Sequence, residues 1–372
     1  KYHQSGSIEE AEQMKTGIWG AGNIAHTHAE ALLASGIPIG AVVDVSEEKA
    51  RAFAEEFGIE NWGTDPAVLL TDEITTVHVC TPPNLHYDMV MLLLDHKKNV
   101  LCEKPLCFDN GQARELAERA KKSGVVCAIN FNVRFHMACQ KARQLVSSEE
   151  FGRVNVIHGS YLQEFNAFPA PIDWRYNSVL AGRMRAVTEI GTHWLDISQY
   201  ISGRRVTALS ASFGRFYPNR YVEDRTMYPD SGDGRRTETM EVLSEDAAAV
   251  NLRFDNGAIG TMLLSEVSQG RINRITLEVT GEKKNLWWNS EDNNILHTAV
   301  KGNGVNTEIF GFGNGFMDTF RSLVNSFYDD VKRGCVSENP VYPTFEEGRD
   351  IVALCNAMLE SADSDGRWVT VE

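Results

Sequence analysis

Lys104 and His193 are the two side chains best suited to exchange a proton with a bound hydroxyl group. Lys104 precedes Pro105, and the residue before a proline is held in an extended conformation, which fixes the direction of the lysine side chain. His193 lies in a helix-like run, four residues after Glu189 and three residues before Asp196. Because residues at these spacings share a helical face, a carboxylate there would orient the imidazole and raise its basicity. The pattern is typical of a general base, with the lysine ammonium stabilising a developing alkoxide.

The same side chains have simpler interpretations. Lysine is mostly a surface residue, and a histidine in a helix often serves only as a cap or as a hydrogen-bonding group in the core. Glu189 and His193 could also be two ligands of a metal ion. A catalytic zinc site usually takes three protein ligands. The sequence offers no third ligand with convincing spacing, so we expect no metal.

A glycine-rich turn is the first sign of a nucleotide cofactor. Residues 17–25 read GIWGAGNIA and contain G-x-G-x-x-A between an apolar strand and a helical pattern. In such a turn Gly20 permits the tight bend, Gly22 lets the backbone approach a pyrophosphate, and Ala25 lets helix and strand pack closely. The helix N-terminus would supply N–H groups for the phosphates. The residues expected around the phosphates are Gly20, Ala21, Gly22, Asn23 and Ile24.

Asp44 closes the second apolar strand, where an acidic residue is expected to bind the ribose hydroxyls of such a cofactor. A carboxylate accepts hydrogen bonds from a 2′-hydroxyl and repels a 2′-phosphate. The next two residues are Val45 and Ser46 rather than arginine. The sequence therefore favours NAD over NADP. The alternative to a nucleotide site is a glycine-rich turn of an unrelated α/β fold.

Residues 15 to about 130 alternate short apolar strands with helical patterns, which predicts a doubly wound parallel sheet. After residue 133 strands follow one another with few helices between them, which predicts a largely antiparallel sheet. Asn256-Gly257 is a hairpin signal between two of these strands. We expect a Rossmann domain over residues 15–134 and a substrate-binding and oligomerisation domain over 135–372. The strands are expected at 17–19, 39–44, 76–80, 99–102, 125–130, 153–163, 206–213, 247–254, 258–265 and 274–280; the helices at 23–35, 47–57, 85–95, 110–123, 137–146, 188–201, 315–333 and 344–362; and a long loop at 219–236.

Composition narrows the class of partner. The formal net charge is −15, which disfavours nucleic acid and anionic membranes. The longest apolar run, Met89 to Leu94, is far shorter than the roughly 20 residues that a membrane helix needs. The seven cysteines show no CxxC pair, which favours a reduced, cytoplasmic setting. The polar residues 1–14 do not resemble a secretory signal. The sequence begins with Lys1 rather than Met, which is compatible with a leader that has been removed.

Four further motifs occur in a characteristic order. Residues 80–86 read CTPPNLH, residues 102–106 CEKPL, residues 130–135 NFNVRF and residues 189–196 EIGTHWLD. With the glycine turn, they resemble the glucose–fructose oxidoreductase, inositol dehydrogenase and rhizopine catabolism (Gfo/Idh/MocA) family. The resemblance covers nearly the whole chain after residue 14. It implies a Rossmann domain, then an α/β domain with a large open, mostly antiparallel sheet, an active site between them, and a homodimer or homotetramer formed through the sheet.

The resemblance also implies roles for individual residues. Lys104, His193 and Glu189 would be catalytic, with Glu189 standing where relatives usually carry Asp. The cofactor would also contact Thr81, Pro82, Asn84, His86, Glu103, Lys104 and Asn130. The substrate would contact Lys104, Arg134, Trp174, Arg175, Glu189 and His193.

The function implied is NAD-dependent hydride transfer to or from a carbon of a sugar, an inositol or a related polyol. A hydrolase or epimerase that retains NAD, and a regulator that binds NAD without catalysis, are the alternatives. Arg183 and Arg185 interrupt a stretch that is often glycine-rich in the family. We hypothesise that one of them meets an anionic group of the substrate; the simpler interpretation is a surface loop with solvated arginines.

Overall fold

The structure is a computed structural model that describes residues 14–313 and 315–371. These residues form two compact units, each considered by itself. The first unit contains residues 14–132 and 315–349, and the second contains residues 133–313 and 350–371. This division differs from the expected domains 15–134 and 135–372, because residues 315–349 group with the first unit.

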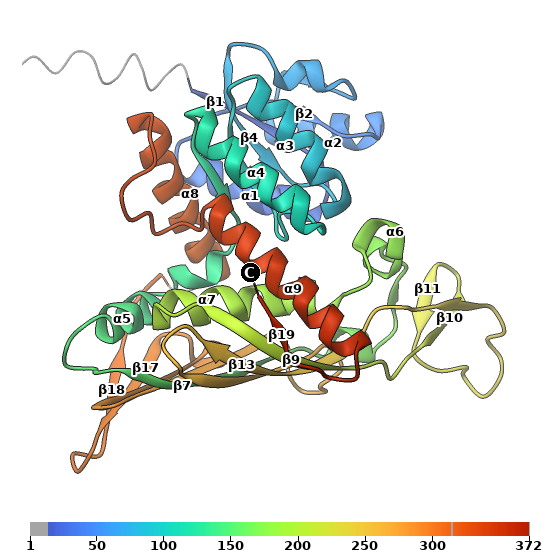
Figure 1. Ribbon diagram of the computed structural model, residues 1–372. Helices are drawn as coiled ribbons and strands as arrows, with labels where there is room; N and C mark the ends of the chain where they lie inside the picture. The colour runs from blue at the N-terminus through green and yellow to red at the C-terminus, as the bar shows by residue number, and fades with distance from the viewer. Residues whose placement is uncertain (1–13, 314, 372) are drawn as a thin grey trace, which may run out of the picture. The chain divides into compact units, whose positions relative to one another are not determined.

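The first unit is built on a six-stranded parallel sheet with the order β3-β2-β1-β4-β5-β6. Figure 1 labels its strands β1, β2 and β4. Its strands are β1 Lys15–Trp19, β2 Ile39–Val43, β3 Asn61–Gly63, β4 Ile74–Val79, β5 Asn99–Cys102 and β6 Cys127–Ile129. The strand order reverses at β1, and ligands of open α/β sheets bind outside the carboxyl ends of strands at such a point. This places the expected cofactor residues at one edge of one sheet.

The α-helices that lie wholly within the described residues of the first unit are α1 Asn23–Ala34, α2 Glu47–Phe57, α3 His86–Asp95, α4 Asn110–Ser123 and α8 Phe316–Arg333. Sequence signals at the ends of α4 explain why its bounds were predicted correctly. The Asp109 side chain accepts a hydrogen bond from the Gln112 N–H at its start, and Gly124 takes a left-handed conformation at its end. The place of α8 was not predicted. Tyr328 of α8 is hydrogen-bonded to Thr16 of β1, which ties this late helix to the first strand.

The second unit is built on a nine-stranded sheet with the order β18-β17-β16-β15-β7-β14-β13-β9-β19. All neighbours are antiparallel except β7 and β14. The Asn256-Gly257 hairpin joins β13 to β14, with Gly257 at φ +84°. Its strands are β7 Val154–Leu162, β9 Val206–Gly214, β13 Ala247–Phe254, β14 Ile259–Ser265, β15 Arg274–Gly281, β16 Lys284–Asn289, β17 Ile295–Val300, β18 Val305–Ile309 and β19 Val369–Thr370.

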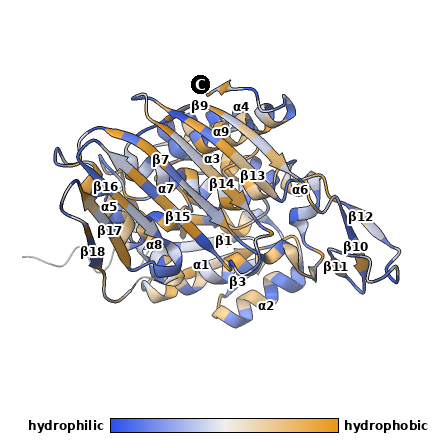
Figure 2. Cartoon of the chain, turned by 90° about the horizontal axis from the view of Figure 1, so that it is seen from below, coloured by the Kyte–Doolittle hydropathy of each residue, from blue (hydrophilic) through white to orange (hydrophobic). Residues whose placement is uncertain are grey.

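Helices α5 (Met137–Val146) and α7 (Thr192–Ser202) pack on one face of this sheet. Trp194 of α7 donates a hydrogen bond from Nε1 to the Thr276 carbonyl oxygen of β15 at 2.9 Å. The contact requires Gly159, because a Cβ there would lie 1.9 Å from that same oxygen. Buried and exposed residues alternate along β13 and β14, so the exposed ones point to the other face of the sheet. Figure 2 shows the strands of this sheet coloured by hydropathy.

The expected loop at 219–236 is partly wrong. It contains β10 Asn219–Glu223 and β11 Thr226–Tyr228, which form a small antiparallel sheet with β8 Ala170–Pro171 and β12 Thr239–Glu241. Their tight turn uses Asp224 and Arg225 at positive φ rather than a glycine. The remaining helices are α6 Ser178–Ala181 and α9 Phe345–Asp363. None of the helices in the described ranges is both long enough and apolar enough to cross a membrane.

Candidate active site

The glycine turn between β1 and α1 has the geometry of a phosphate-binding loop. Gly20 lies at φ +101°, and a Cβ there would meet the Cys80 carbonyl oxygen at 2.9 Å, so the end of β4 packs closely on the turn. A Cβ on Gly22 would have no atom within 4 Å, which leaves space above the turn. No side chain caps the N-terminus of α1, and no acidic residue lies in its first turn. The turn therefore fits an anionic pyrophosphate.

Asp44 ties the end of β2 to this turn. Its Oδ2 accepts a hydrogen bond from the Ala21 N–H, and its Oδ1 accepts one from the Ser46 N–H, both at 2.8 Å. A carboxylate oxygen has two lone pairs, so each oxygen keeps an acceptor position for a ribose hydroxyl. The placement supports the preference for NAD.

His86 at the start of α3 connects two loops at the same sheet edge. Its Nε2 lies 2.8 Å from the Thr81 carbonyl oxygen and its Nδ1 lies 2.9 Å from the Pro105 carbonyl oxygen. The ring is fully buried, and this burial lowers its pKa. Both ring nitrogens face backbone, so His86 holds the loops that follow β4 and β5. The cofactor contact expected of His86 stays a prediction. Thr81 and Pro82 are half-buried, and Asn84 is exposed.

Glu103 follows β5 and is 7 % exposed. Its Oε1 accepts hydrogen bonds from Nε2 of His28 at 2.9 Å and from Nδ2 of Asn130 at 2.5 Å. Burial acts to raise the pKa of Glu103, but the hydrogen bonds from these two residues and the charge of Lys104 hold it below its ordinary value. Glu103 is therefore an ionised carboxylate beside the half-buried Lys104, whose backbone N–H also donates to Oε2 at 3.2 Å.

In the second unit, the expected helix over 188–201 begins with a π-helical turn. Val187–Gly191 is π-helical, and α7 follows from Thr192. Glu189 lies in this wider turn, so its four-residue spacing from His193 no longer corresponds to one α-helical turn. Single π-turns inside helices are frequent at functional sites.

Arg175 contacts the Glu189 carboxylate directly. Its Nε donates to Oε2 of Glu189 at 2.9 Å, and its Nη1 lies 3.2 Å from the carboxylate oxygens of Asp173. The guanidinium carbon lies 4.6 Å from the centre of the Trp174 ring. Burial disfavours the charged guanidinium, but Glu189 and Asp173 raise the pKa of Arg175 above its ordinary value. The structure thus brings together three of the residues expected to bind substrate, and the half-buried His193 follows on α7.

Arg134 and Asp196 differ from expectation. Each side chain is almost fully buried, and the Arg134 guanidinium forms a two-armed ion pair with the Asp196 carboxylate, with Nε 3.0 Å from Oδ2. The guanidinium also lies over the Tyr200 ring. This ion pair joins Arg134 to α7, and the substrate contact expected of Arg134 stays a prediction.

The two arginines expected to meet an anion have protein partners. Arg183 is exposed and pairs with Asp363 of α9. Arg185 is 1 % exposed and pairs with Glu266 at 2.7 Å and Asp246 at 2.6 Å. Arg185 is therefore held inside the second unit and does not lie on a surface loop, whereas Arg183 is exposed.

The acidic group that holds the π-turn was not predicted from the sequence. Glu245 accepts the backbone N–H groups of Val187 and Arg185 at 2.7 and 3.1 Å. Burial raises the pKa of Glu245 to about 7. Glu245 lies two residues before β13, and Glu266 directly follows β14. Acidic residues at the ends of two neighbouring strands were the available signal. No three His, Cys, Asp or Glu residues within the described ranges are arranged to hold a metal ion.

Comparison with known proteins agrees with this geometry. Residues 14–131 match the model of an oxidoreductase family with an NAD-binding Rossmann fold, and residues 139–287 match the GFO/IDH/MocA C-terminal domain. The fold and the glycine turn thus define an NAD-binding oxidoreductase. Within that class, the chain belongs to the Gfo/Idh/MocA family. The family, the two-part α/β fold and the NAD cofactor expected from the sequence are confirmed.

Relatives match this chain over nearly its whole length. Levoglucosan dehydrogenase of Pseudarthrobacter phenanthrenivorans is 26% identical, over 97% of this chain and 98% of its own length. Myo-inositol 2-dehydrogenase of Thermotoga maritima is 27% identical, over 94% and 96%. The solved structure of a levoglucosan dehydrogenase in complex with NADH and L-sorbose superposes with a TM-score of 0.86 at 24% identity, over 96% of this chain and 99% of that one, and shares the fold.

Proposed function

We propose that the protein is an NAD-dependent dehydrogenase that acts on a hydroxyl-bearing carbon of a sugar, an inositol or a related polyol. The observation that carries the proposal is the position of Lys104. It follows β5 at the sheet edge that also holds the glycine turn and Asp44, and it stands beside the ionised Glu103. Dehydrogenases of levoglucosan and myo-inositol among the relatives support this substrate class.

In the proposed mechanism, side chains of the protein transfer the proton and stabilise the charge that develops. NAD, when bound, accepts or returns the hydride. The Lys104 ammonium donates a hydrogen bond to the reacting oxygen and stabilises negative charge that develops there. His193 removes the hydroxyl proton in oxidation and returns it in reduction. Glu189 stabilises the protonated imidazole of His193 that forms when the hydroxyl proton is transferred. Arg175 fixes the direction of the Glu189 carboxylate.

A panel of sugars and polyols with NAD, followed by the absorbance of reduced nicotinamide, tests the proposal. Lys104→Ala and His193→Ala are expected to lower kcat by roughly 10²–10⁴-fold, while NADH binding measured by fluorescence stays close to wild type. Lys121→Ala and His96→Ala are matched controls, because both side chains are exposed and lie away from the proposed site residues of the first unit. Near-normal rates in either site variant contradict its role. Turnover without release of NADH identifies a cofactor-retaining hydrolase or epimerase, and NAD binding without turnover identifies a regulator.

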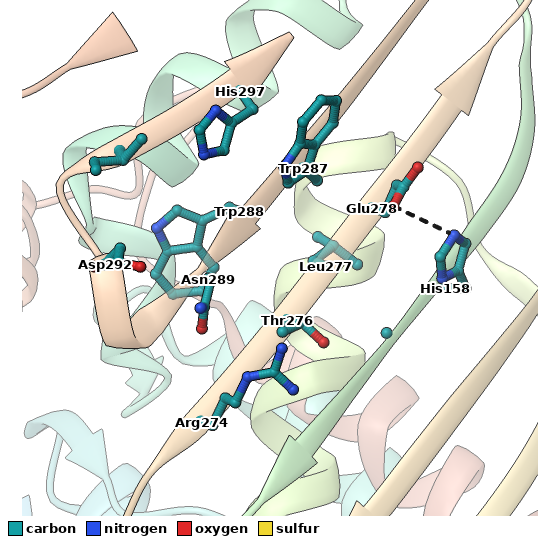
Figure 3. A pocket seen from close by; sticks show the side chains of 12 residues that line it. His158, Arg274, Thr276, Leu277, Glu278, Trp287, Trp288, Asn289, Asp292 and His297 are labelled. Carbon is teal, nitrogen blue, oxygen red and sulfur yellow. Dashed lines mark ion pairs between the residues drawn. The ribbon is translucent and has the colours of Figure 1, made fainter. Parts of the chain in front are cut away.

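We also propose that the uncovered face of the nine-stranded sheet binds a second copy of the chain. A row of side chains crosses this face at one register, from His297 on β17 through Trp287, Glu278 and His158 to Thr261 on β14. Trp287 stacks on His297 with ring centres 5.1 Å apart. His297, Trp287, Glu278 and His158 line the pocket shown in Figure 3. Its volume is about 360 Å³.

The composition of this face supports the second copy as its occupant. Ile259 and Leu263 are 60% and 48% exposed and lie on β14 beside the row. His158 and Glu278 form an ion pair of 3.7 Å across neighbouring strands, drawn dashed in Figure 3. A surface that carries apolar side chains and charges of both signs is able to complement itself across a two-fold axis.

A further inference from the structure

Five buried side chains form a continuous hydrogen-bonded chain inside the first unit. The Thr16 hydroxyl lies 2.5 Å from the Tyr328 hydroxyl, which lies 3.1 Å from Nε2 of His78. Nδ1 of His78 lies 2.8 Å from Nδ1 of His28. Nε2 of His28 lies 2.9 Å from the Glu103 carboxylate. The chain links β1, α8, β4, α1 and the end of β5, and each of its residues is at most 7% exposed.

The Glu103 end of this chain fixes the direction of every proton in it. An ionised carboxylate accepts only, so His28 carries a proton on Nε2. With a single proton, His28 offers a lone pair at Nδ1, and His78 must therefore donate from its own Nδ1. Nε2 of His78 is then an acceptor for the Tyr328 hydroxyl, which in turn accepts from Thr16. All four hydrogen bonds point toward Glu103.

A doubly protonated His28 reverses this order. It would donate from Nδ1 to His78, which would then carry its proton on Nε2 and donate to Tyr328. The surroundings oppose a charge here: rings of Phe320 and Phe327 lie 4.7 Å from the His28 ring and 6.5 Å from the His78 ring. Burial, with a smaller contribution from His28, lowers the pKa of His78 well below its ordinary value. The arrangement directed toward Glu103 is the one that avoids a buried imidazolium.

The far end of the chain, at Thr16, is fully buried. The chain therefore does not lead protons to solvent, and its effect is to polarise the hydrogen bond that His28 donates to Glu103. The other polar or titratable groups near Glu103 are Asn130 from the end of β6, Lys104, His86 from α3, and the thiols of Cys80 and Cys102. Burial raises the pKa of both thiols, so they stay neutral and Lys104 supplies the nearby charge.

We propose that His28, His78 and Tyr328 are positioning residues that keep Glu103 ionised and fixed in direction, and that Glu103 thereby keeps Lys104 protonated at the substrate hydroxyl. The part that concerns Lys104 rests on the proposed function. The part that concerns the chain of hydrogen bonds does not, since it is a property of the first unit alone.

The chain of hydrogen bonds is tested on the unaltered protein. Long-range ¹⁵N–¹H NMR of histidine-labelled protein near neutral pH distinguishes the two tautomers, and contacts with the Phe320 and Phe327 rings assign the two histidines. We expect neutral rings with the proton on Nε2 of His28 and on Nδ1 of His78. A proton on Nε2 of His78, or a doubly protonated His28, overturns the proposal whether or not a substrate is known.

The effect on Lys104 is tested with a pair of variants. His28→Leu removes the donor to Glu103, whereas His28→Gln offers an amide N–H in its place. On any substrate that turns over, we expect His28→Leu to lower kcat by about tenfold and to move the alkaline limb of the pH profile to lower pH, because a Glu103 carboxylate that has lost this donor is no longer fixed beside the ammonium and stabilises it less. His28→Gln should recover part of both effects, with NADH affinity unchanged in both variants.

Three results overturn this second part. One is an unchanged pH profile in a folded His28→Leu protein. Another is a loss that appears only as weaker NADH binding. The third is equal impairment of the Leu and Gln variants. If His28→Leu does not fold, Tyr328→Phe replaces it: the hydroxyl is lost with little change in volume, and the expected alkaline limb moves in the same direction by less.

Discussion

Arg175 and Glu189 form an ion pair in the second unit, and this pair fixes the direction of the carboxylate that we assign to the reaction. Their separation of 14 residues, and the neighbouring Asp173, were visible in the sequence, yet the contact was not predicted. Spacing identified Glu189 and His193 because both follow one local helical pattern. It could not identify the partners of Arg134 and Arg185, which lie 62 and 81 residues away and are brought near by tertiary packing.

At this scale we predict that Arg175→Leu lowers kcat/KM by about tenfold or more, because Glu189 loses a charge-assisted hydrogen bond that sets its direction. Arg175→Lys keeps the charge but loses the fork, and should recover only part of the rate. Arg183→Leu is the matched control, since its partner Asp363 is exposed and an exposed pair contributes little. Steady-state kinetics on neutral and acidic sugars decide: equal rates for Arg175→Leu and Arg183→Leu refute the assignment.

The π-turn and α7 are the elements that carry the second unit's reactive groups, and the sheet below fixes both. The regular βα units were predicted because their apolar periodicity is strong and their caps are standard, as at Asp109 and Gly124. The π-turn was not predicted, since its cause is Glu245, more than 50 residues further along the chain. Very short strands such as β8 offer no periodicity at all.

For the seating of α7 on the sheet, we predict that Gly159→Ala destabilises the fold by about 2–4 kcal/mol. The new methyl group would lie 1.9 Å from the Thr276 carbonyl oxygen and 2.9 Å from Nε1 of Trp194, so the hydrogen bond that seats α7 must break. Urea unfolding followed by tryptophan fluorescence measures the change. Gly311→Ala, where a Cβ meets nothing within 4 Å, should be nearly neutral; a similar small effect at Gly159 would show that α7 does not depend on this contact.

The buried Glu245 predicts a pH dependence of stability. Burial raises the pKa of Glu245 to about 7 in the folded chain, above roughly 4.3 in the unfolded chain. The folded state therefore binds more protons between these values, and its stability falls as pH rises from about 4.5 through 7. Relative to Glu245→Gln, wild type should lose on the order of 2–3 kcal/mol across this window. Denaturant unfolding at a series of pH values measures the difference, and a difference independent of pH contradicts the assignment.

For the whole molecule, the sequence indicated two domains because the pattern of strands and helices changes near residue 133. It did not indicate that residues 315–349 return to the first unit. The helical period of α8 shows which face is apolar but not which sheet covers it. The proposed self-association likewise depends on one face of the nine-stranded sheet. Strands far apart in the sequence form this face, so no local pattern indicates it.

At this scale we predict that Leu263→Arg lowers the oligomeric state, because it places an unpaired charge at the centre of the proposed interface. Light scattering coupled to gel filtration measures the mass in solution. Leu33→Arg on α1 is the matched control, with 50% exposure against 48% for Leu263. A monomeric wild type would show that this face does not bind a second copy. An oligomeric wild type whose mass is kept by both variants would show that the interface lies elsewhere.

The return of α8 to the first strand has a practical consequence for anyone who wishes to transplant the nucleotide-holding half. A gene fragment that stops at residue 132 would code for all six strands but not for Tyr328 or Phe320. Such an excised piece would expose the groups that these two rings cover, His78 and His28 among them. A usable module must instead join residue 132 to residue 315 through an artificial linker, as a circularly permuted or spliced gene would.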